Sequence, residues 1–210
     1  MSSIKVKLQP CMDYDSALAM QQEERVRVRK GESVGTIFIL EHDPPVITLG
    51  RRCSGENILV SGEELASSGY QVRETGRGGD VTVHEPGQVI AYFVLPLGSK
   101  DAGMFVSRVM TTMSDFLNKY FSVNAPYDPS RPGLWTDGEK LCSVGFDLTG
   151  GVSMHGIALN VSNSLKGFSL IVPCGMSNVT MTTLSRAAGT VIDSGRVASE
   201  LVLYLEREFI

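Results

Sequence analysis

The sequence predicts an α+β fold, or an α/β fold with a mixed sheet, and three observations support this class. Stretches with strand periodicity and stretches with helix periodicity intermix along the 210 residues without a strict strand–helix–strand rhythm. Residues 134–161 hold several strand-like runs joined only by short turns, which is typical of an antiparallel meander. Hydrophobic residues at 42% and charged residues at 20% are typical of a globular protein.

One domain is expected to span residues 1–210, because no linker, repeat or low-complexity segment interrupts a length that can bury a sizeable core. Residues 1–7 alternate polar and apolar side chains and lack the continuous apolar region of a signal peptide. We therefore expect a cytoplasmic protein that does not enter a membrane. A net charge of -4 argues against general nucleic-acid binding, although a local basic patch could receive an acidic partner protein.

The cysteines and histidines predict neither a disulfide framework nor a metal site. No two cysteines form a C-x-x-C pair, and none has metal-like spacing with a histidine, so reduced thiols and no metal site are expected. We also expect the protein to use no cofactor. The residues concerned are Cys11, Cys53, Cys142, Cys174, His42, His84 and His155.

Capping signals predict two helices in the first part of the chain. Asp13 or Asp15 can cap the first, which ends at Gly31, and Ser61 with Glu64 has capping-box spacing for a second, short one. The other elements expected there are strands at 4–8, 36–40, 46–49 and 70–74.

Residues 75–88 form a glycine-rich loop, a short strand and a Pro-Gly turn before the apolar strand 89–95. Glycines let backbone N–H groups approach a ligand closely, and Arg77 supplies a fixed charge. The pattern is neither G-x-G-x-x-G nor a P-loop, so it predicts no dinucleotide or triphosphate. The alternative is a tight hairpin with an ion pair between Arg77 and Asp80.

The second part of the chain predicts an amphipathic helix at 103–121 and then the meander. In its last strand, 152–161, Gly156 and Ala158 share a face and leave a smooth groove for a ligand chain. His155 points to the other face, where a structural role is favoured over that of a general base. The further elements expected are a buried strand at 168–172, a short helix at 184–188 and a terminal helix with Val197, Leu201 and Leu205 on one stripe.

Lys140 and Cys174 suggest a reactive pair. Alternation along the strand 140–148 places Lys140 on the same face as Cys142 and other apolar residues that should point inward. A cationic lysine lowers the pKa of a nearby cysteine, so the pair would give a reactive thiolate at a site edge. The alternatives are that Lys140 extends to solvent at the strand end and that Cys174 is a packing residue.

Five motifs stand in register along the chain. They are Leu40-Glu41-His42-Asp43-Pro44-Pro45-Val46 with Thr48-Leu49-Gly50-Arg51, Arg77-Gly78-Gly79-Asp80-Val81-Thr82-Val83-His84, Lys140-Leu141-Cys142-Ser143-Val144-Gly145, His155-Gly156-Ile157-Ala158-Leu159-Asn160 and Ile171-Val172-Pro173-Cys174-Gly175. Together they resemble the lipoyl(octanoyl) transferase family, the LipB branch of the biotin and lipoate protein ligase fold. The resemblance covers nearly the whole chain and implies a single catalytic domain with a largely antiparallel mixed sheet flanked by helices.

The resemblance implies the acyl-thioester nucleophile at Cys174 and a lysine at Lys140 that lowers its pKa. It implies transfer of an octanoyl or lipoyl group, without ATP, from the thioester of acyl carrier protein to a lysine of a lipoyl domain. The implied acceptors are the lipoyl domains of 2-oxoacid dehydrogenase E2 subunits and the glycine cleavage H protein. The implied substrate-binding residues are Arg77, Gly78, Gly79, Asp80, Val81, Thr82, Val83, His84, Ser143, Val144, Gly145, Gly156, Ile157 and Ala158.

One motif departs from the family pattern. Members usually read His-Gly-Pro-Gly-Gln after an aromatic residue, whereas this chain has Val83 and then His84-Glu85-Pro86-Gly87-Gln88. The departure places the carboxylate of Glu85 near the expected site.

Basic residues could receive the acidic carrier. The candidates are Arg51, Arg52 and Arg73. The cations that end the first helix suit the helix dipole and are most often a solvated face, with docking of a partner as the alternative. The helix-terminal cations are Arg25, Arg27, Arg29 and Lys30.

Three other functions stay open. An ATP-dependent lipoate or biotin protein ligase would share the glycine-rich segment and the lysine strand, but it needs no cysteine nucleophile. A lipoyl-domain amidotransferase would use the same acyl-enzyme with a different donor. A non-catalytic module would only hold a lipoyl domain or an acyl chain, and the presence of Lys140 and Cys174 argues against it.

Overall fold

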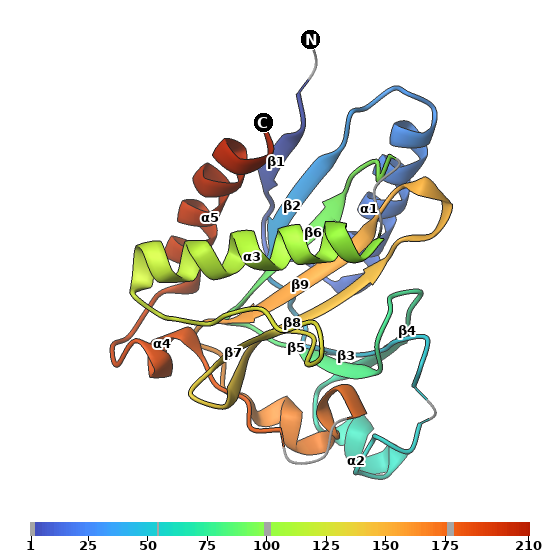
Figure 1. Cartoon of the computed structure of the whole chain (residues 1–210). Coiled ribbons are helices and arrows are strands. Elements are labelled where there is room, and N and C mark those ends of the chain that lie inside the picture. Colours follow the sequence, from blue (N-terminus) through green and yellow to red (C-terminus); the bar gives the residue numbers. More distant parts are fainter. Residues whose placement is uncertain (1–2, 54, 99–101, 176–178) are drawn as a thin grey trace.

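The computed structural model describes residues 3–53, 55–98, 102–175 and 179–210, which form two β-sheets with helices packed on them (Figure 1). The strands are β1 (Lys5–Leu8), β2 (Thr36–Leu40), β3 (Val46–Leu49), β4 (Gln71–Glu74), β5 (Val81–His84), β6 (Gln88–Val94), β7 (Leu134–Thr136), β8 (Glu139–Asp147) and β9 (Met154–Asn160). The α-helices are α1 (Tyr14–Arg29), α2 (Gly62–Ser67), α3 (Ala102–Phe121), α4 (Leu184–Ala187) and α5 (Ser194–Phe209). The short 3-10 helices are η1 (Thr149–Gly151), η2 (Lys166–Leu170) and η3 (Pro173–Gly175).

The larger sheet has six strands in the order β1-β2-β6-β9-β8-β7. Only β1 and β2 run parallel, and the other neighbours are antiparallel. Apolar side chains of β2, β6, β8 and β9 pack with α3 and α5 on one face, and α1 packs on the opposite face (Figure 1). Burying the apolar stripes of these helices is the main stabilising term of the fold.

The smaller sheet has the order β4-β3-β5, with β3 parallel to β4 and antiparallel to β5. Its apolar face packs against α2, η2 and the chain around Met181, so segments distant in sequence share one small core. The core residues are Ile47, Leu65, Val81, Val83, Phe168, Ile171 and Met181.

The structure confirms the α+β class and most of the expected elements. Asp13 caps α1 by accepting a hydrogen bond from the Ser16 N–H at 2.9 Å, and Ser61 and Glu64 form the expected capping box at α2. Among the described residues, no helix is both long and apolar enough to cross a membrane.

The expected strand at 168–172 is wrong. Its first three residues belong to η2, and of the other two only Ile171 makes a single bridge, to Ile58. Leu165 takes the left-handed conformation with φ 63°, and its N–H donates to the carboxylate of Glu85 at 2.6 Å. The buried carboxylate of Glu85 therefore holds a turn at the start of a segment whose apolar residues alone predict a strand.

Candidate active site

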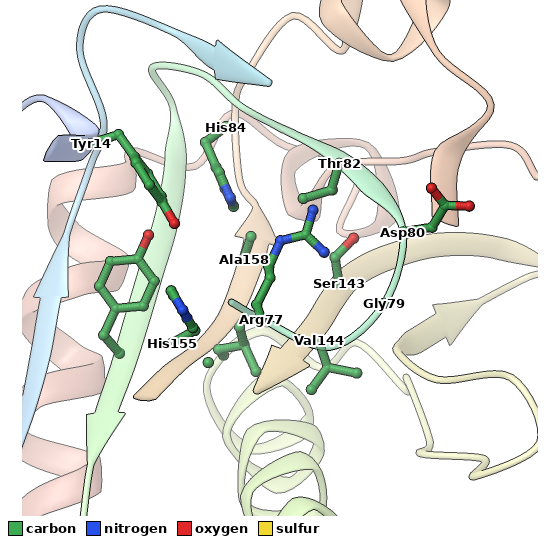
Figure 2. A pocket seen from close by; sticks show the side chains of 14 residues that line it. Tyr14, Arg77, Gly79, Asp80, Thr82, His84, Ser143, Val144, His155 and Ala158 are labelled. Atoms are coloured by element: carbon green, nitrogen blue, oxygen red, sulfur yellow. The ribbon is translucent and has the colours of Figure 1, made fainter. Parts of the chain in front are cut away.

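A narrow cavity lies where the two sheets meet, beside the start of α1 (Figure 2). Its volume is about 460 Å³ when the space open to solvent is counted, and only about 40 Å³ is wide enough for the centre of a water molecule. Such close walls suit an extended alkyl chain better than a bulky group. We call this cavity the slot, and its lining residues are Tyr14, Arg77, Gly79, Asp80, Thr82, His84, Tyr92, Ser143, Val144, Gly145, His155, Gly156, Ile157 and Ala158.

Two wider clefts adjoin the slot. The first, which we call the Gly175 cleft, shares Gly79, Asp80 and Val144 with the slot and is also lined by Arg52, Pro129, Ser130, Pro132 and Gly175. The second, the α1 cleft, shares His155 with the slot and is also lined by Leu18, Gln22, Arg25, Val26, Arg29, Glu74, Thr75, Gly76, Asp147 and Met154. Asp80 and His155 lie at opposite ends of the slot (Figure 2), so one cleft adjoins each end.

Arg77 lines the slot and is held mainly by Thr48 of the smaller sheet. Its Nε and Nη2 donate to Thr48 Oγ1 at 3.1 and 2.9 Å, Nη2 donates to the Thr48 carbonyl at 2.6 Å, and Nη1 donates to the Gly78 carbonyl at 3.1 Å. Asp80 accepts from Asn57 Nδ2 at 2.5 Å and from the Val81 N–H at 2.7 Å. Between these two described residues the ion pair of a plain hairpin does not form.

The end of the slot away from Asp80 is lined by rings. Tyr14 stacks on His84 at a centroid distance of 6.5 Å, and Tyr92 meets His155 edge-on at 6.3 Å. Behind them His42 Nδ1 lies 3.1 Å from the Met12 carbonyl, so it donates there, and Nε2 accepts from the Tyr92 hydroxyl at 2.8 Å.

Burial keeps these imidazoles uncharged. It lowers the pKa of His42 to about 4 and, with a smaller contribution from Arg77, that of His155 to about 4. Burial likewise lowers the pKa of His84 well below its ordinary value, with further contributions from His42 and Arg77. At neutral pH this end of the slot therefore presents neutral rings to a ligand.

Lys140 is almost fully buried, with 1% of its surface exposed. Its Nζ lies 5.5 Å from the centroid of the Trp135 ring, and a Cβ added to Gly133 would lie 2.6 Å from its Cε. The interpretation that Lys140 extends to solvent at the strand end is therefore wrong. Gly133 follows Pro132, which lines the Gly175 cleft, so the lysine lies behind that wall.

Cys174 lies in η3, and its side chain is outside the described residues. The backbone around it is tied to the slot: the Val172 N–H donates to the Asn57 carbonyl at 2.8 Å, and η3 packs against β5. Gly175 has φ 65°, and a Cβ there would overlap the carboxylate of Asp80. Glycine therefore allows this turn to rest on the outer end of the slot.

Comparison with known proteins identifies the family. Residues 13–206 match the family model described as lipoyl protein ligase A/B catalytic domain. An octanoyltransferase of Caldicellulosiruptor saccharolyticus is 36% identical over 97% of this chain and 89% of its own length. Another, from Geobacter metallireducens, is 40% identical over 89% of this chain and 84% of its own.

The chain belongs to the octanoyltransferase branch of the lipoyl protein ligase A/B family. It is thus an acyltransferase enzyme, and its reaction class is lipoyl or octanoyl transfer.

Solved structures show the same fold at low sequence identity. A putative lipoate protein ligase from T. acidophilum with bound lipoic acid has a TM-score of 0.74 at 13% identity and covers 99% of this chain and 85% of its own. A biotin protein ligase from Aquifex aeolicus in complex with biotin and ATP has a TM-score of 0.58 at 13% identity. That match covers 98% of this chain and 70% of the ligase. These matches confirm the predicted biotin and lipoate ligase fold.

In this octanoyltransferase-family chain the slot brings together most of the expected substrate-binding residues. Gly78, Val81 and Val83 differ, because none of the three lines the described slot. Val81 and Val83 point into the core of the smaller sheet, and the Gly78 N–H pairs with the Phe146 carbonyl at 2.8 Å. Those that line it are Arg77, Gly79, Asp80, Thr82, His84, Ser143, Val144, Gly145, Gly156, Ile157 and Ala158.

Three lining residues were not predicted from the sequence: Tyr14, Tyr92 and His155. His155 has φ 61°, which breaks the alternation of β9, so its ring faces the slot together with Gly156 and Ala158 rather than the opposite face. Gly156 also has a structural requirement, because a Cβ there would overlap the Ala91 carbonyl of the neighbouring strand. A tyrosine that opens a capped helix gives no sequence signal for a pocket.

Glu85 does not contribute a carboxylate to the slot. It is 3% exposed and accepts hydrogen bonds from the Tyr70 hydroxyl at 2.6 Å, Asn163 Nδ2 at 2.9 Å and the Leu165 N–H at 2.6 Å. Burial raises the pKa of the Tyr70 hydroxyl, and its hydrogen bond to Glu85 raises that pKa further. Glu85 therefore fastens the loop that leads to η2 and η3.

The basic residues differ in what they contact. Arg73 pairs with Asp15 at 2.9 Å, and Arg51 pairs with Asp147 at 3.3 Å, whereas Arg52 lines the Gly175 cleft. Arg25, expected on a solvated helix face, is instead largely buried in an ion pair with Asp147 at 2.8 Å.

Proposed function

We propose that the protein transfers an octanoyl or lipoyl group from the thioester of acyl carrier protein to one lysine of a lipoyl domain, through an acyl-thioester on Cys174. The observation that carries this proposal is the buried Lys140, whose strand is bonded to the segment following Cys174. The homologous octanoyltransferases support the acyl group.

Acylation begins at a thiolate. A free cysteine with a pKa of about 8.5 is only a few per cent thiolate at pH 7, and a neighbouring ammonium can lower that pKa by about two units. In our proposal the ammonium of Lys140 has this effect on Cys174. The thiolate attacks the thioester carbonyl, a new C–S bond forms, and the carrier thiolate leaves with the proton of Lys140.

Transfer completes the cycle. The amine of the acceptor lysine attacks the acyl-enzyme, a C–N bond forms, and the C–S bond to Cys174 breaks. The neutral amine left on Lys140 takes the proton of the incoming nucleophile, which restores the thiolate–ammonium pair. No ATP is required, because a thioester is already activated.

The slot is the proposed site of the acyl chain. Gly79, Asp80 and Val144 join it to the Gly175 cleft, so the thioester end would lie near η3 with the chain extending toward the rings. Val144, Ile157 and Ala158 offer apolar walls, while Ser143 and Thr82 lie nearer the outer end (Figure 2).

The Gly175 cleft is the proposed entry for both protein substrates. Its width is suited to an arm that carries the thioester and then to the side chain of the acceptor lysine. Arg52 there could receive the acidic carrier, because Arg51 and Arg73 are paired with carboxylates. The proposed acceptors are the lipoyl domains of 2-oxoacid dehydrogenase E2 subunits and the glycine cleavage H protein.

The test is transfer of octanoyl to a purified lipoyl domain under two conditions: octanoyl-acyl carrier protein without ATP, and octanoate with ATP. We expect product only from the thioester and none with Cys174→Ser. An ATP-dependent product that survives Cys174→Ser would instead establish a ligase. Octanoylated lipoyl domain offered as the donor tests the amidotransferase, which would transfer from it faster than from the carrier.

A further inference from the structure

His155 closes the end of the slot opposite Asp80. It lines both the slot and the α1 cleft, is 3% exposed, and meets Tyr92 edge-on. Its imidazole therefore stands between the narrow slot and the wider α1 cleft. Removing the ring would join the two spaces.

The backbone holds the ring in this position. Pairing of β9 with β6 extends only to Gly156 and Tyr92, and at His155 the chain takes φ 61°. The N–H of His155 donates to Gln21 Oε1 at 2.8 Å, and Gln21 is itself fully buried. A conformation that L-residues seldom adopt therefore aims the ring along the slot and is stabilised from α1.

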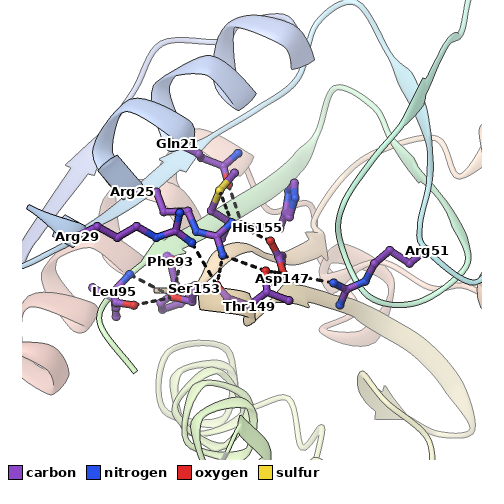
Figure 3. A network of polar contacts seen from close by, with 11 residues as sticks. Gln21, Arg25, Arg29, Arg51, Phe93, Leu95, Asp147, Thr149, Ser153 and His155 are labelled. Carbon is purple, nitrogen blue, oxygen red and sulfur yellow. Dashed lines mark hydrogen bonds and ion pairs between the residues drawn. The ribbon is translucent and has the colours of Figure 1, made fainter. Parts of the chain in front are cut away.

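A polar network lies beside His155 on the α1 side (Figure 3). Arg25 Nη1 donates to Asp147 Oδ2 at 2.8 Å and contacts the sulfur of Met154 at 3.3 Å, and Asp147 also pairs with Arg51. Arg25, Asp147 and Met154 line the α1 cleft together with His155. On this side the His155 ring shares the α1 cleft with the Arg25–Asp147 ion pair.

We propose that His155 sets the maximum length of acyl chain that the slot accepts, by forming its end wall. This inference rests on the proposed function, because it takes the slot as the acyl site. It assigns His155 a specificity role rather than one in bond making, since its ring lies at the opposite end of the slot from Asp80, against which Gly175 rests.

The test compares kcat/KM for acyl carrier protein loaded with octanoyl, decanoyl, dodecanoyl or tetradecanoyl groups, using wild type and His155→Gly. Glycine adopts positive φ readily, so this substitution removes the ring without adding backbone strain. A buried methylene is worth up to about fourfold in binding. We expect the dodecanoyl-to-octanoyl ratio to rise about tenfold or more in His155→Gly.

Matched variants distinguish the loss of the His155 ring from a nonspecific disturbance of the site. His155→Phe keeps a ring and should keep the wild-type length profile. Val26→Ala trims an exposed side chain of the α1 cleft and should also keep it. If His155→Gly does not fold, His155→Ala carries the same prediction. If kcat/KM of the glycine or alanine variant depends on acyl-chain length as in wild type, the inference is overturned. If wild type transfers no acyl group from any of the loaded carriers, the proposed function itself is overturned.

Discussion

Lys140 and Met181 form a parallel bridge, which ties the buried lysine to the chain seven residues beyond Cys174. The Lys140 N–H donates to the Thr180 carbonyl at 2.8 Å, and its carbonyl accepts from the Thr182 N–H at 3.0 Å. The start of the lysine strand is thus joined to the segment that follows the Cys174 motif by backbone hydrogen bonds, which depend little on side-chain identity. The proposed pairing of Lys140 with Cys174 rests on this connection.

Replacing Lys140 should change the pH dependence of acylation. Without the ammonium, the thiolate fraction of Cys174 at pH 7 would fall to a few per cent, so we expect Lys140→Ala to acylate about 10- to 30-fold more slowly there. The loss should shrink as the pH approaches 9, and Lys140→Arg should recover part of the rate at pH 7. Rapid-quench acylation rates across this pH range make the comparison, and a loss equal at all pH values would contradict the role of Lys140 in lowering the pKa of Cys174.

Gly133→Ala tests whether the position of Lys140 matters. The new Cβ would lie 2.6 Å from both the Cys142 carbonyl oxygen and Lys140 Cε, so the lysine must move. We expect acylation to fall about tenfold or more. Gly138→Ala is the matched control, because Gly138 also has a positive φ, 82°, but open space around it. Equal activities in the two variants would count against the required placement of Lys140.

Glu85 should contribute to stability rather than to catalysis directly. Glu85→Ala removes a buried acceptor of the Tyr70, Asn163 and Leu165 donors, and we expect a loss of about 2 to 4 kcal/mol in the free energy of unfolding. Glu85→Gln retains part of the hydrogen bonding and should lose less. Urea denaturation measures both free energies. An unchanged midpoint for Glu85→Ala would show that the hydrogen bonds of Glu85 contribute nothing to stability.

The buried histidines should make the fold sensitive to acid. The pKa of His42 is about 4 in the folded protein and about 6.5 when exposed, so the unfolded chain binds protons more strongly. This contribution is complete above about pH 6.5 and is lost as the pH falls toward 4, on the order of 1 to 3 kcal/mol. Urea midpoints should fall over this window in wild type and less steeply in His42→Gln. Parallel pH profiles would contradict the prediction.

The sequence predicts the elements well where periodicity and capping agree. Ser61 and Glu64 mark α2, and the alternating and apolar runs mark β2, β3 and β8, because each signal is local. The strand expected at 168–172 fails for a non-local reason: Glu85, about 80 residues earlier in the sequence, supplies the acceptor that turns the chain.

The slot could be predicted only in part for the same reason. Residues in the motifs with Arg77 and Ser143 line it, but Tyr14 and Tyr92 belong to elements whose patterns predict only a helix start and a buried strand. His155 faces the slot because one residue has a positive φ, and neither alternation nor composition predicts that conformation.

The most direct test of the account is intact-mass spectrometry after brief incubation with octanoyl-acyl carrier protein, without acceptor. We predict one octanoyl adduct that hydroxylamine removes, that added lipoyl domain discharges, and that is absent from Cys174→Ser. An adduct of the same yield on Cys174→Ser, or transfer to the lipoyl domain at full rate with no adduct on the enzyme, would contradict the covalent mechanism.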